Sequence, residues 1–377
     1  MPERMLTPGP TAVPPEVQQA LARPIIHHRT PEFRETFSEV CKLTQQLFCT
    51  QHPILTITGS GTAGMEGAIV SAARPERKVL VARYGKFSER WSLVSKNAGL
   101  KTVTLDTEWG QMVTPAQIAD ALENDPAIGT VVVTHSESST GAVCDLEAIA
   151  DVVHSSDVLL LADCITSVGA IPMKFDDWGV DIAVVGSQKA LMLPPGLAFA
   201  AVSPKAWEVI DSFSSGAYYL NYKAYRDSLN KGGDTPYTPA IGLIMAAQAA
   251  LRMIFARGPI EATWQKTRRL AAATRSAAGA LGLSLLANLP GDSITAICAP
   301  PGVDAEALRK QLLAGHQIRL AGGQNQLKGK IFRISHLGYV SDEDMIETIK
   351  ALEAVLPQFS HTFEAGKASS QIQEALR

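Results

Sequence analysis

The chain has no marked excess of charge of either sign. Its 377 residues include 34 Lys and Arg against 37 Asp and Glu, which gives a formal net charge of −3. The composition therefore favours neither a nucleic-acid-binding surface nor a strongly acidic or basic partner. The sequence also lacks an apolar run of the roughly 20 residues that cross a bilayer, and its start is proline-rich rather than apolar. We expect a cytoplasmic protein with neither nucleic acid nor a membrane as a partner.

Cysteine is scarce. The five cysteines are scattered along the chain and include no Cys-x-x-Cys pair. An odd number without such pairs argues against a disulfide framework and against structural zinc. The eight histidines show no metal-ligand spacing, so the sequence predicts no metal site. Apolar residues make up 46% of the chain and charged residues 19%, which is typical of an ordinary soluble globular protein.

Apolar, strand-like runs alternate with helical patterns through the first half of the chain. The runs lie at 78–82, 102–105, 130–134, 158–162, 182–185 and 197–202. Such alternation predicts an α/β fold in which parallel strands are joined by right-handed crossovers. The later pattern of two strands among three helices predicts a smaller α+β domain (helices 260–281, 303–314 and 341–355; strands 293–298 and 330–335).

This organisation divides the chain into four parts. The sequence predicts an N-terminal arm at 1–20, a large domain at 21–257, a small C-terminal domain at 258–360 and a peripheral tail at 361–377. Prolines keep the start of the arm extended, whereas the tail is assigned to the periphery because it is polar.

Lys189 directly follows the apolar run 182–185, in the sequence Gly-Ser-Gln-Lys-Ala. A short, β-branched, uninterrupted run predicts a buried strand of a parallel sheet, and open α/β sheets bind ligands at the carboxyl ends of their strands. A lysine in apolar surroundings must pair, shift its pKa or react. The Leu-Pro-Pro-Gly sequence at 193–196 fixes the backbone after it. We interpret Lys189 as a candidate Schiff-base nucleophile.

Asp163 closes the apolar run 158–162 and precedes Lys189 by about one strand–helix–strand step. The two side chains should therefore meet at one edge of the sheet, where Ser138 is also expected after the run 130–134. This combination matches the needs of pyridoxal phosphate. The lysine forms the imine, while a carboxylate keeps the pyridine nitrogen protonated so that the ring acts as an electron sink.

A phosphate cradle is predicted at Ser60, Gly61 and Thr62, which begin a helix of small residues. Such a start offers unpaired backbone N–H groups, two hydroxyls and the positive end of the helix dipole. The alternative interpretation is a simple helix cap, because Gly/Ser turns are common before helices. The expected position of Asp163 and Lys189 at the same sheet edge favours the cradle.

Three other residues each keep two interpretations. Tyr84 and Phe87 follow the run 78–82, and either ring is expected to stack over a planar cofactor or to pack in the core. Arg333 lies inside a strand-like run, where it either clamps a substrate carboxylate or forms a salt bridge between the domains.

The chain resembles a fold-type I, class V pyridoxal-phosphate aminotransferase, and in particular the alanine–glyoxylate and serine–glyoxylate (or serine–pyruvate) aminotransferases. Arg333 with its flanks and four segments carry the resemblance: Pro-Gly-Pro at 8–10, Gly-Ser-Gly-Thr-Ala-Gly-Met-Glu at 59–66, His-Ser-Glu-Ser-Ser-Thr-Gly at 135–141, and the stretch from Asp163 to the Pro-Pro-Gly at 194–196. The Ser-Gln-Lys-Ala and Glu-Ser-Ser-Thr-Gly sequences are the most specific of these.

The resemblance implies transamination between alanine or serine and a small 2-oxo acid, glyoxylate or pyruvate, on pyridoxal 5′-phosphate. Lys189 would hold the cofactor as a Schiff base and move the proton, and Asp163 would pair with the pyridinium. The other implied cofactor contacts are Ser60, Gly61, Thr62, Phe87, Ser138 and Gln188, and the implied substrate contacts are Arg333 and Gly9. Position 62 is histidine in some relatives, so the threonine here removes any imidazole role.

The resemblance also implies a homodimer with the active site at the interface, to which the partner subunit would supply Thr235 and Thr238 near the phosphate. One alternative is a lyase on the same fold, such as a cysteine desulfurase, but the only late cysteine, Cys298, lies in a predicted strand. Another is a non-catalytic family member, against which Lys189 and Asp163 together argue. A dehydrogenase is disfavoured because the run 78–82 ends in Arg83 rather than an acidic residue.

Overall fold

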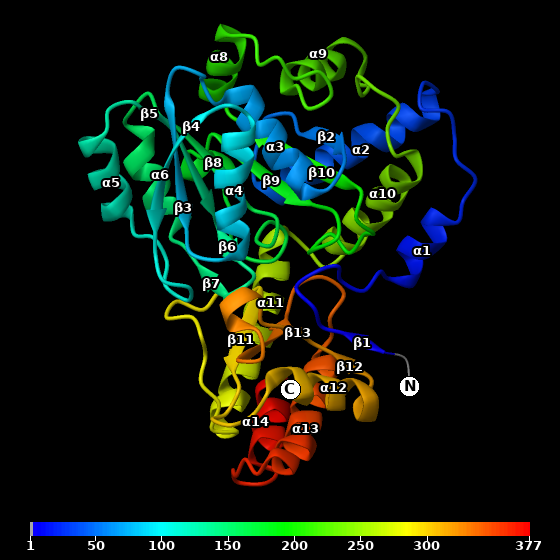
Figure 1. Cartoon of the computed structure of the whole chain (residues 1–377). Coiled ribbons are helices and arrows are strands. Elements are labelled where there is room, and N and C mark those ends of the chain that lie inside the picture. Colours follow the sequence, from blue (N-terminus) through cyan, green and yellow to red (C-terminus); the bar gives the residue numbers. More distant parts are fainter. Residues whose placement is uncertain (1–2) are drawn as a thin grey trace.

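A seven-stranded sheet in the order β2-β10-β9-β8-β5-β3-β4 organises the larger part of the molecule in the computed structural model, which describes residues 3–377 (Figure 1). Its strands are β2 (Leu55–Thr58), β3 (Lys78–Arg83), β4 (Lys101–Asp106), β5 (Ile128–Thr134), β8 (Leu159–Asp163), β9 (Ile182–Gly186) and β10 (Leu197–Val202). The strands from β9 to β4 are parallel, whereas β10 is antiparallel to both of its neighbours. The expectation of a mostly parallel sheet is confirmed.

Two strands of this sheet differ from the prediction. The run at 197–202 was expected to be parallel, but β10 is antiparallel because the segment 187–196 is shorter than the crossover of about a dozen or more residues that a parallel pair needs. β2 is an edge strand that the sequence analysis does not predict. It has only four residues and ends directly before the glycine-rich turn at 59–61, so it offers little periodicity to detect.

Both faces of the sheet are covered by helices. Successive residues of β5 alternate between the two sides: Val131 and Val133 pack in one core cluster and Val132 in the other. One face carries α3 (Gly61–Ala72), α4 (Lys86–Asn97), α8 (Pro204–Ser212) and α9 (Tyr222–Gly232). The other carries α1 (Pro15–Leu21), α2 (Pro31–Phe48), α5 (Pro115–Asn124), α6 (Leu146–His154), α7 (Phe175–Trp178) and α10 (Ile241–Phe255).

A second hydrophobic core forms in the C-terminal part of the chain, below the sheet in Figure 1. It contains the three-stranded sheet β11 (Ile294–Cys298), β14 (Ile331–Ser335) and β13 (Ala321–Gly322), with helices α11 (Ile260–Ala280), α12 (Ala305–His316), α13 (Asp342–Val355) and α14 (Lys367–Ala375). Short 3₁₀ turns lie at Asn325–Leu327 and Leu356–Phe359. α11 connects the two cores, because its first turns pack with the large sheet and its last turns with this one.

The tail is a correction to the prediction. It was assigned to the periphery, but α14 packs against α11 and α13 and buries Ala368 and Ile372 completely. The polar residues that suggested a peripheral position lie on the other side of this short amphipathic helix. Its apolar positions are few and far apart, so they escape notice in a predominantly polar stretch.

The N-terminal arm runs from the second core to the carboxyl ends of the large sheet. β1 (Arg4–Met5) pairs in parallel with β12 (Ile318–Arg319), and Leu6 is buried in the second core. Further along, the backbone N–H of Thr11 donates to the carbonyl oxygen of Gln188 at 3.1 Å. The start of the arm is therefore extended and reaches Lys189 at Thr11, whereas its last residues, from Pro15, belong to helix α1.

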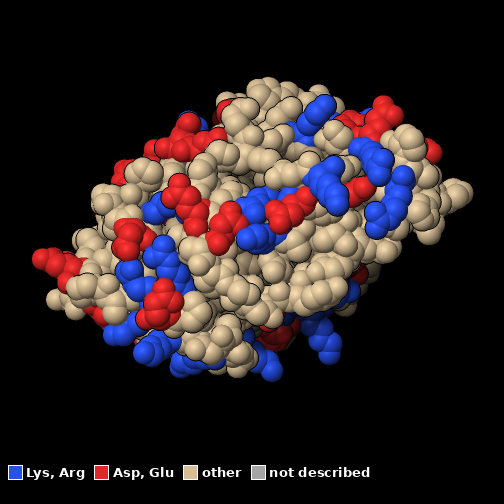
Figure 2. All heavy atoms as spheres, turned by 90° about the horizontal axis from the view of Figure 1, so that it is seen from above, with Lys and Arg blue, Asp and Glu red and all other residues tan. Residues whose placement is uncertain are grey.

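Charged side chains of both signs are interspersed on the face of the molecule seen from above (Figure 2). Among residues 3–377, no single helix has the length and apolarity needed to span a membrane; only α10 and α11 taken together, with a bend of 76° between them, meet that test.

Candidate active site

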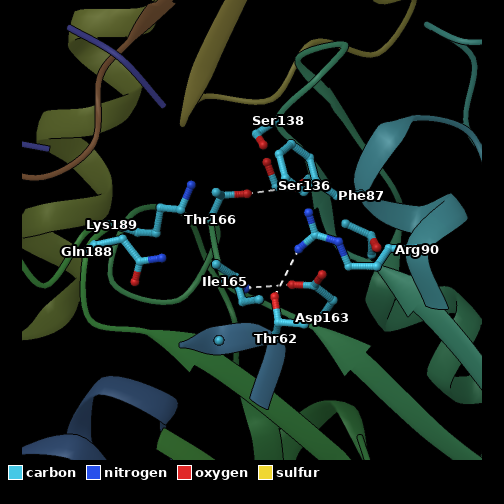
Figure 3. A pocket seen from close by; sticks show the side chains of 12 residues that line it. Thr62, Phe87, Arg90, Ser136, Ser138, Asp163, Ile165, Thr166, Gln188 and Lys189 are labelled. Carbon is cyan, nitrogen blue, oxygen red and sulfur yellow. Dashed lines mark hydrogen bonds between the residues drawn. The ribbon is translucent and has the colours of Figure 1, made fainter. Parts of the chain in front are cut away.

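A cavity opens at the carboxyl ends of β5, β8 and β9, facing the first turns of α3 and α4 (Figure 3). The structure brings together most of the site residues predicted from the sequence. Those that line the cavity are Gly61, Thr62, Phe87, Ser138, Asp163, Gln188 and Lys189. Ser60 immediately precedes Gly61 as the N-cap of α3. The convergence of these residues follows from parallel strands that end at the same edge.

Lys189 lies just beyond β9 and is only 8% exposed. Its Nζ donates a hydrogen bond of 2.8 Å to the carbonyl oxygen of Pro8, and it lies 5.9 Å from the centre of the Phe87 ring. Gly9 must be glycine here, because its φ is +130° and a Cβ would lie 2.4 Å from Nζ of Lys189. Burial lowers the pKa of Lys189 to about 8. Gly9 is thus the residue that lets the arm approach the amine closely.

Asp163 is the last residue of β8 and is buried. One carboxylate oxygen accepts from the backbone N–H of Ile165 at 3.0 Å, and the other accepts from the indole N–H of Trp91 at 3.1 Å. Burial raises the pKa of Asp163 to about 7, and the charges of Arg90 and Lys189, neither of which forms an ion pair with it, oppose this shift only in part. The carboxylate is fixed in orientation and lacks a positive partner.

The residues predicted to form a phosphate cradle lie at the start of α3. Ser60 makes no side-chain capping bond to the helix, so its hydroxyl is not used by the backbone. A Cβ at Gly61 would lie 2.6 Å from the side chain of Ile165, which explains why the cradle needs glycine there. The side-chain oxygen of Gln188 is buried without a hydrogen-bond partner. Gln188 also lines the cavity beside this helix N-terminus, so its side-chain NH2 group can donate, together with the helix N–H groups, to an anion such as phosphate.

The two aromatic candidates, Phe87 and Tyr84, lie in different surroundings. Phe87 is partly buried and lines the cavity. Tyr84 is buried in the core, where its hydroxyl donates to the carbonyl oxygen of Thr134 at 2.6 Å and accepts from its N–H at 2.7 Å. The structure therefore leaves Phe87 as the ring available for stacking.

Arg333 lies on β14 of the small sheet and is 6% exposed. Its guanidinium donates to the carbonyl oxygen of Ser138 at 2.6 Å and to that of Gly322 at 2.6 and 3.0 Å. The alternative of a salt bridge between the domains is wrong: among residues 3–377, Arg333 contacts the large unit through a carbonyl rather than a carboxylate. A buried guanidinium that forms no ion pair with a carboxylate of the described chain is suited to receive one from a ligand.

Thr235 and Thr238 do not line the cavity of their own chain. The hydroxyl of Thr235 donates to the carbonyl oxygen of Tyr237 at 2.7 Å, within the same loop.

Cys298, the thiol considered for desulfurase chemistry, is at the end of β11, and none of the residues that line the cavity is a cysteine. No group of three or more His, Cys, Asp or Glu side chains that could hold a metal ion is found in the described chain.

The sequence does not predict several residues at the cavity, and three of them contact predicted site residues through their side chains. Arg90 reaches into it, where its guanidinium donates to Thr62 Oγ1 at 2.9 Å and lies 5.2 Å from the centre of the Phe87 ring (Figure 3). The indole N–H of Trp91 donates to the carboxylate of Asp163. Glu137 is buried and accepts hydrogen bonds from the backbone N–H groups of Phe87 and Ser88. Arg90 lies three residues after Phe87, a spacing that places both side chains on one face of a helix. This spacing is the sequence signal that could have identified Arg90.

The free space among these side chains is about 80 Å³, below the roughly 300–1,000 Å³ of ligand pockets. Two long side chains, Lys189 and Arg90, occupy part of the cavity (Figure 3). In chemical kind the residues fit pyridoxal phosphate: an amine, a buried carboxylate, an aromatic ring and a helix N-terminus with the amide NH2 donor of Gln188 beside it.

Comparison with known proteins also relates the chain to pyridoxal-phosphate aminotransferases. The aminotransferase class V profile matches residues 9–349. The chain is 41% identical to a protein of Synechococcus sp. named soluble hydrogenase, small subunit, over 95% of this chain and 94% of that one. It is 34% identical to L-aspartate–glyoxylate aminotransferase of Paracoccus denitrificans (98% and 95% covered) and 33% identical to serine–glyoxylate aminotransferase of Methylorubrum extorquens (93% and 90% covered).

Solved structures of aminotransferases have the same fold as this chain. Ureidoglycine–glyoxylate aminotransferase from Bacillus subtilis superposes with a TM-score of 0.94 at 28% identity, covering 99% of this chain and 97% of that one. Alanine–glyoxylate aminotransferase from Nostoc sp. superposes with a TM-score of 0.90 at 30% identity, covering 94% and 96%. The chain belongs to the class V aminotransferases, which use pyridoxal phosphate.

Proposed function

We propose that this protein catalyses transamination between a small amino acid, alanine or serine, and a small 2-oxo acid, glyoxylate or pyruvate. The observation that carries the proposal is the placement of Lys189 and Asp163 in one cavity, with Arg333, which has no carboxylate partner, bonded to the carbonyl oxygen of the lining residue Ser138. The four glyoxylate aminotransferases compared above differ in their amino donor but share glyoxylate. This supports glyoxylate as the acceptor more strongly than any one donor.

The cofactor, when bound, supplies the electron sink that stabilises negative charge on the substrate Cα. Lys189 is suited to bind it and to move the Cα proton, because with its pKa lowered to about 8 roughly a tenth of the amines are neutral at pH 7. Gly9 keeps the arm close above Nζ and so excludes water from one side of the amine. The amine is both reactive and confined.

Asp163 would stabilise a proton on the pyridine nitrogen. Its two oxygens are held by Trp91 and Ile165, so the carboxylate cannot turn away. Because burial raises its pKa and neither Arg90 nor Lys189 forms an ion pair with it, a protonated ring nitrogen would supply a direct positive partner. Phe87 would cover one face of the ring, and Ser138 would lie near its phenolic oxygen. Ser60, Gly61, Thr62 and Gln188 would hold the phosphate.

Arg333 would bind the carboxylate that donor and acceptor share. Replacing it (Arg333→Ala) removes a charged, two-pronged donor, so KM for both substrates should rise about 10- to 100-fold, from the value of hydrogen bonds to charged groups. Steady-state kinetics of both half-reactions checks this. Arg268→Ala, an exposed arginine on α11, is the control and should leave KM unchanged. An unchanged KM in Arg333→Ala would assign Arg333 a purely structural role.

Arg90 would add positive charge to the phosphate cradle through its contact with Thr62. For Arg90→Met we expect the apparent Kd for pyridoxal phosphate to rise about tenfold, because one charge-assisted contact is lost. Absorbance titration of the apoprotein measures this without reference to turnover. Inorganic phosphate should also compete less well with the cofactor in the variant. An unchanged Kd would leave Arg90 as a support for the Phe87 ring only.

A homodimer with Thr235 and Thr238 supplied across the interface remains part of the proposal. Tyr237, in the loop that holds them, contacts two tyrosines of the segment before α9: Tyr218, which is 82% exposed, and Tyr219, which stacks on it. Tyr219 also donates to the carbonyl oxygen of Thr58, next to the cradle. Sedimentation analysis tests the dimer. Mixing Lys189→Ala with Thr238→Val subunits and measuring partial recovery of activity tests the shared site.

The decisive test of function is a set of half-reactions. Purified holoenzyme is mixed with alanine, serine, aspartate or 2-aminoethylphosphonate, and the loss of cofactor absorbance is followed. Rapid loss with alanine or serine, reversed by glyoxylate or pyruvate, supports the proposal, and a response to aspartate alone would overturn the choice of donor.

The relative named as a hydrogenase subunit raises a second candidate, a family member retained for assembly rather than catalysis. Lys189, Asp163 and Arg333 favour the enzyme, because a purely structural subunit needs none of them. No response to any donor by fully loaded protein, together with co-purification of a hydrogenase, would favour the second candidate.

A further inference from the structure

A second cavity, of about 570 Å³, lies between α11 and the first turn of α13. It is within the roughly 300–1,000 Å³ typical of small-molecule sites. Its walls are Arg257 before α11, two cations on α11, and the segment from Tyr339 to Asp344 that leads into α13. It shares no lining residue with the cavity at Lys189, so it is a separate feature of the molecule.

The cavity holds more positive charge than its own carboxylates neutralise. Its two carboxylates already have partners: Asp342 accepts from Arg269 at 2.7 and 2.9 Å, and Asp344 pairs with Arg4. The other two cations, Arg257 and Lys266, have no such partner. Within residues 3–377, neither side chain forms a hydrogen bond or an ion pair with a carboxylate.

Of the two cations, Lys266 gives the stronger argument for a bound anion. It is partly buried on α11, where burial and the neighbouring Arg257 lower its pKa to about 8, while Asp342 and Asp344 oppose that shift. Charged groups withdrawn from water are normally paired, because an isolated charge there is costly. A bound anion between Lys266 and Arg257 would remove that cost. Tyr339, which is 42% exposed, adds an aromatic surface beside the charges.

We propose that this cavity binds a small organic dianion. One anionic group is held by Lys266 and Arg257, and the organic part lies against Tyr339. The required chemistry is that of a dicarboxylate or a phosphate ester of small size.

Calorimetric titration of the cofactor-loaded protein with succinate and with inorganic phosphate tests the proposal. At least one probe should bind at millimolar concentration. Lys266→Met should weaken that binding about tenfold or more, whereas Arg268→Met, which removes an equal charge from an exposed position of the same helix, should not. Binding of succinate alone identifies a dicarboxylate, and binding of phosphate alone a phosphate ester. No binding of either probe, or equal loss in both variants, would overturn the proposal.

A second measurement needs no variant. The wild-type protein is acetylated with limiting reagent, with and without the probe that binds, and the modification of each lysine is measured by mass spectrometry. The probe should protect Lys266 and leave Lys310, an exposed lysine on α12, unaffected. Equal modification of Lys266 in both conditions would show that the anion binds elsewhere.

Discussion

Replacing Lys189 by alanine is expected to abolish transamination and the absorbance that reports the bond between this lysine and the cofactor. Two functions are lost at once: the amine that binds the cofactor and the base that moves the Cα proton. Loss of a positioned proton-transfer group alone costs about 10²–10⁴-fold, so we expect the turnover number to fall by at least that factor. Absorbance spectra and stopped-flow half-reactions provide the measurements.

The structure suggests how this loss can be separated from misfolding. Lys189 Nζ makes one hydrogen bond, to the carbonyl oxygen of Pro8, so its removal leaves a small space but no unpaired charge. The apoprotein should therefore retain its unfolding midpoint within a few degrees. Lys328→Ala, at an exposed position, is the control and should retain both absorbance and activity. Borohydride reduction of the Lys189→Ala protein that still fixed the cofactor to another lysine would show that the assignment is wrong.

The sequence was sufficient to predict the sheet edge and most of the cavity. Apolar runs followed by Asp163 and Lys189 identify buried parallel strands, and such strands place their last residues together. The prediction depended on periodicity, and it failed where periodicity is weak. β2 and α14 are short, and β10 is antiparallel because of the length of one loop rather than its own residues.

The residues that sequence reasoning missed act through contacts between distant segments. Glu137 accepts from the N–H groups that begin α4, some fifty positions earlier in the chain, and so fixes Phe87. Trp91 reaches Asp163 from the same helix. Neither contact follows from local spacing, since each depends on how α4 packs on the sheet. The choice between the two interpretations of Arg333 likewise needed its partners in space, which are carbonyl oxygens.

The second large effect is expected at Asp163. Asp163→Asn keeps the shape and the hydrogen bond from Ile165 but removes the negative charge that stabilises a protonated ring nitrogen. The cofactor should still bind, whereas turnover should fall about 10²–10³-fold, the usual cost of removing one preorganised electrostatic contact. The matched control is Asp181→Asn, another buried carboxylate whose pKa burial raises, but which bonds Leu160 N and Ser203 away from the cavity.

The pH dependence of the apoprotein gives a readout of Asp163 that does not involve catalysis. Because its folded-state pKa is raised to about 7, the folded protein holds a proton that the unfolded chain releases near its ordinary value of 3.8. Folding stability from this group is therefore full at low pH and is lost as the pH rises through about 7. The Asp163→Asn apoprotein should lack this part of the slope, and the cofactor should abolish it in the wild type by supplying a positive partner. If denaturant titrations show the same slope in both apoproteins while turnover remains near normal in the variant, Asp163 is not the partner of the ring nitrogen. If the slope changes but turnover does not, the carboxylate is buried as inferred and another group stabilises the protonated ring.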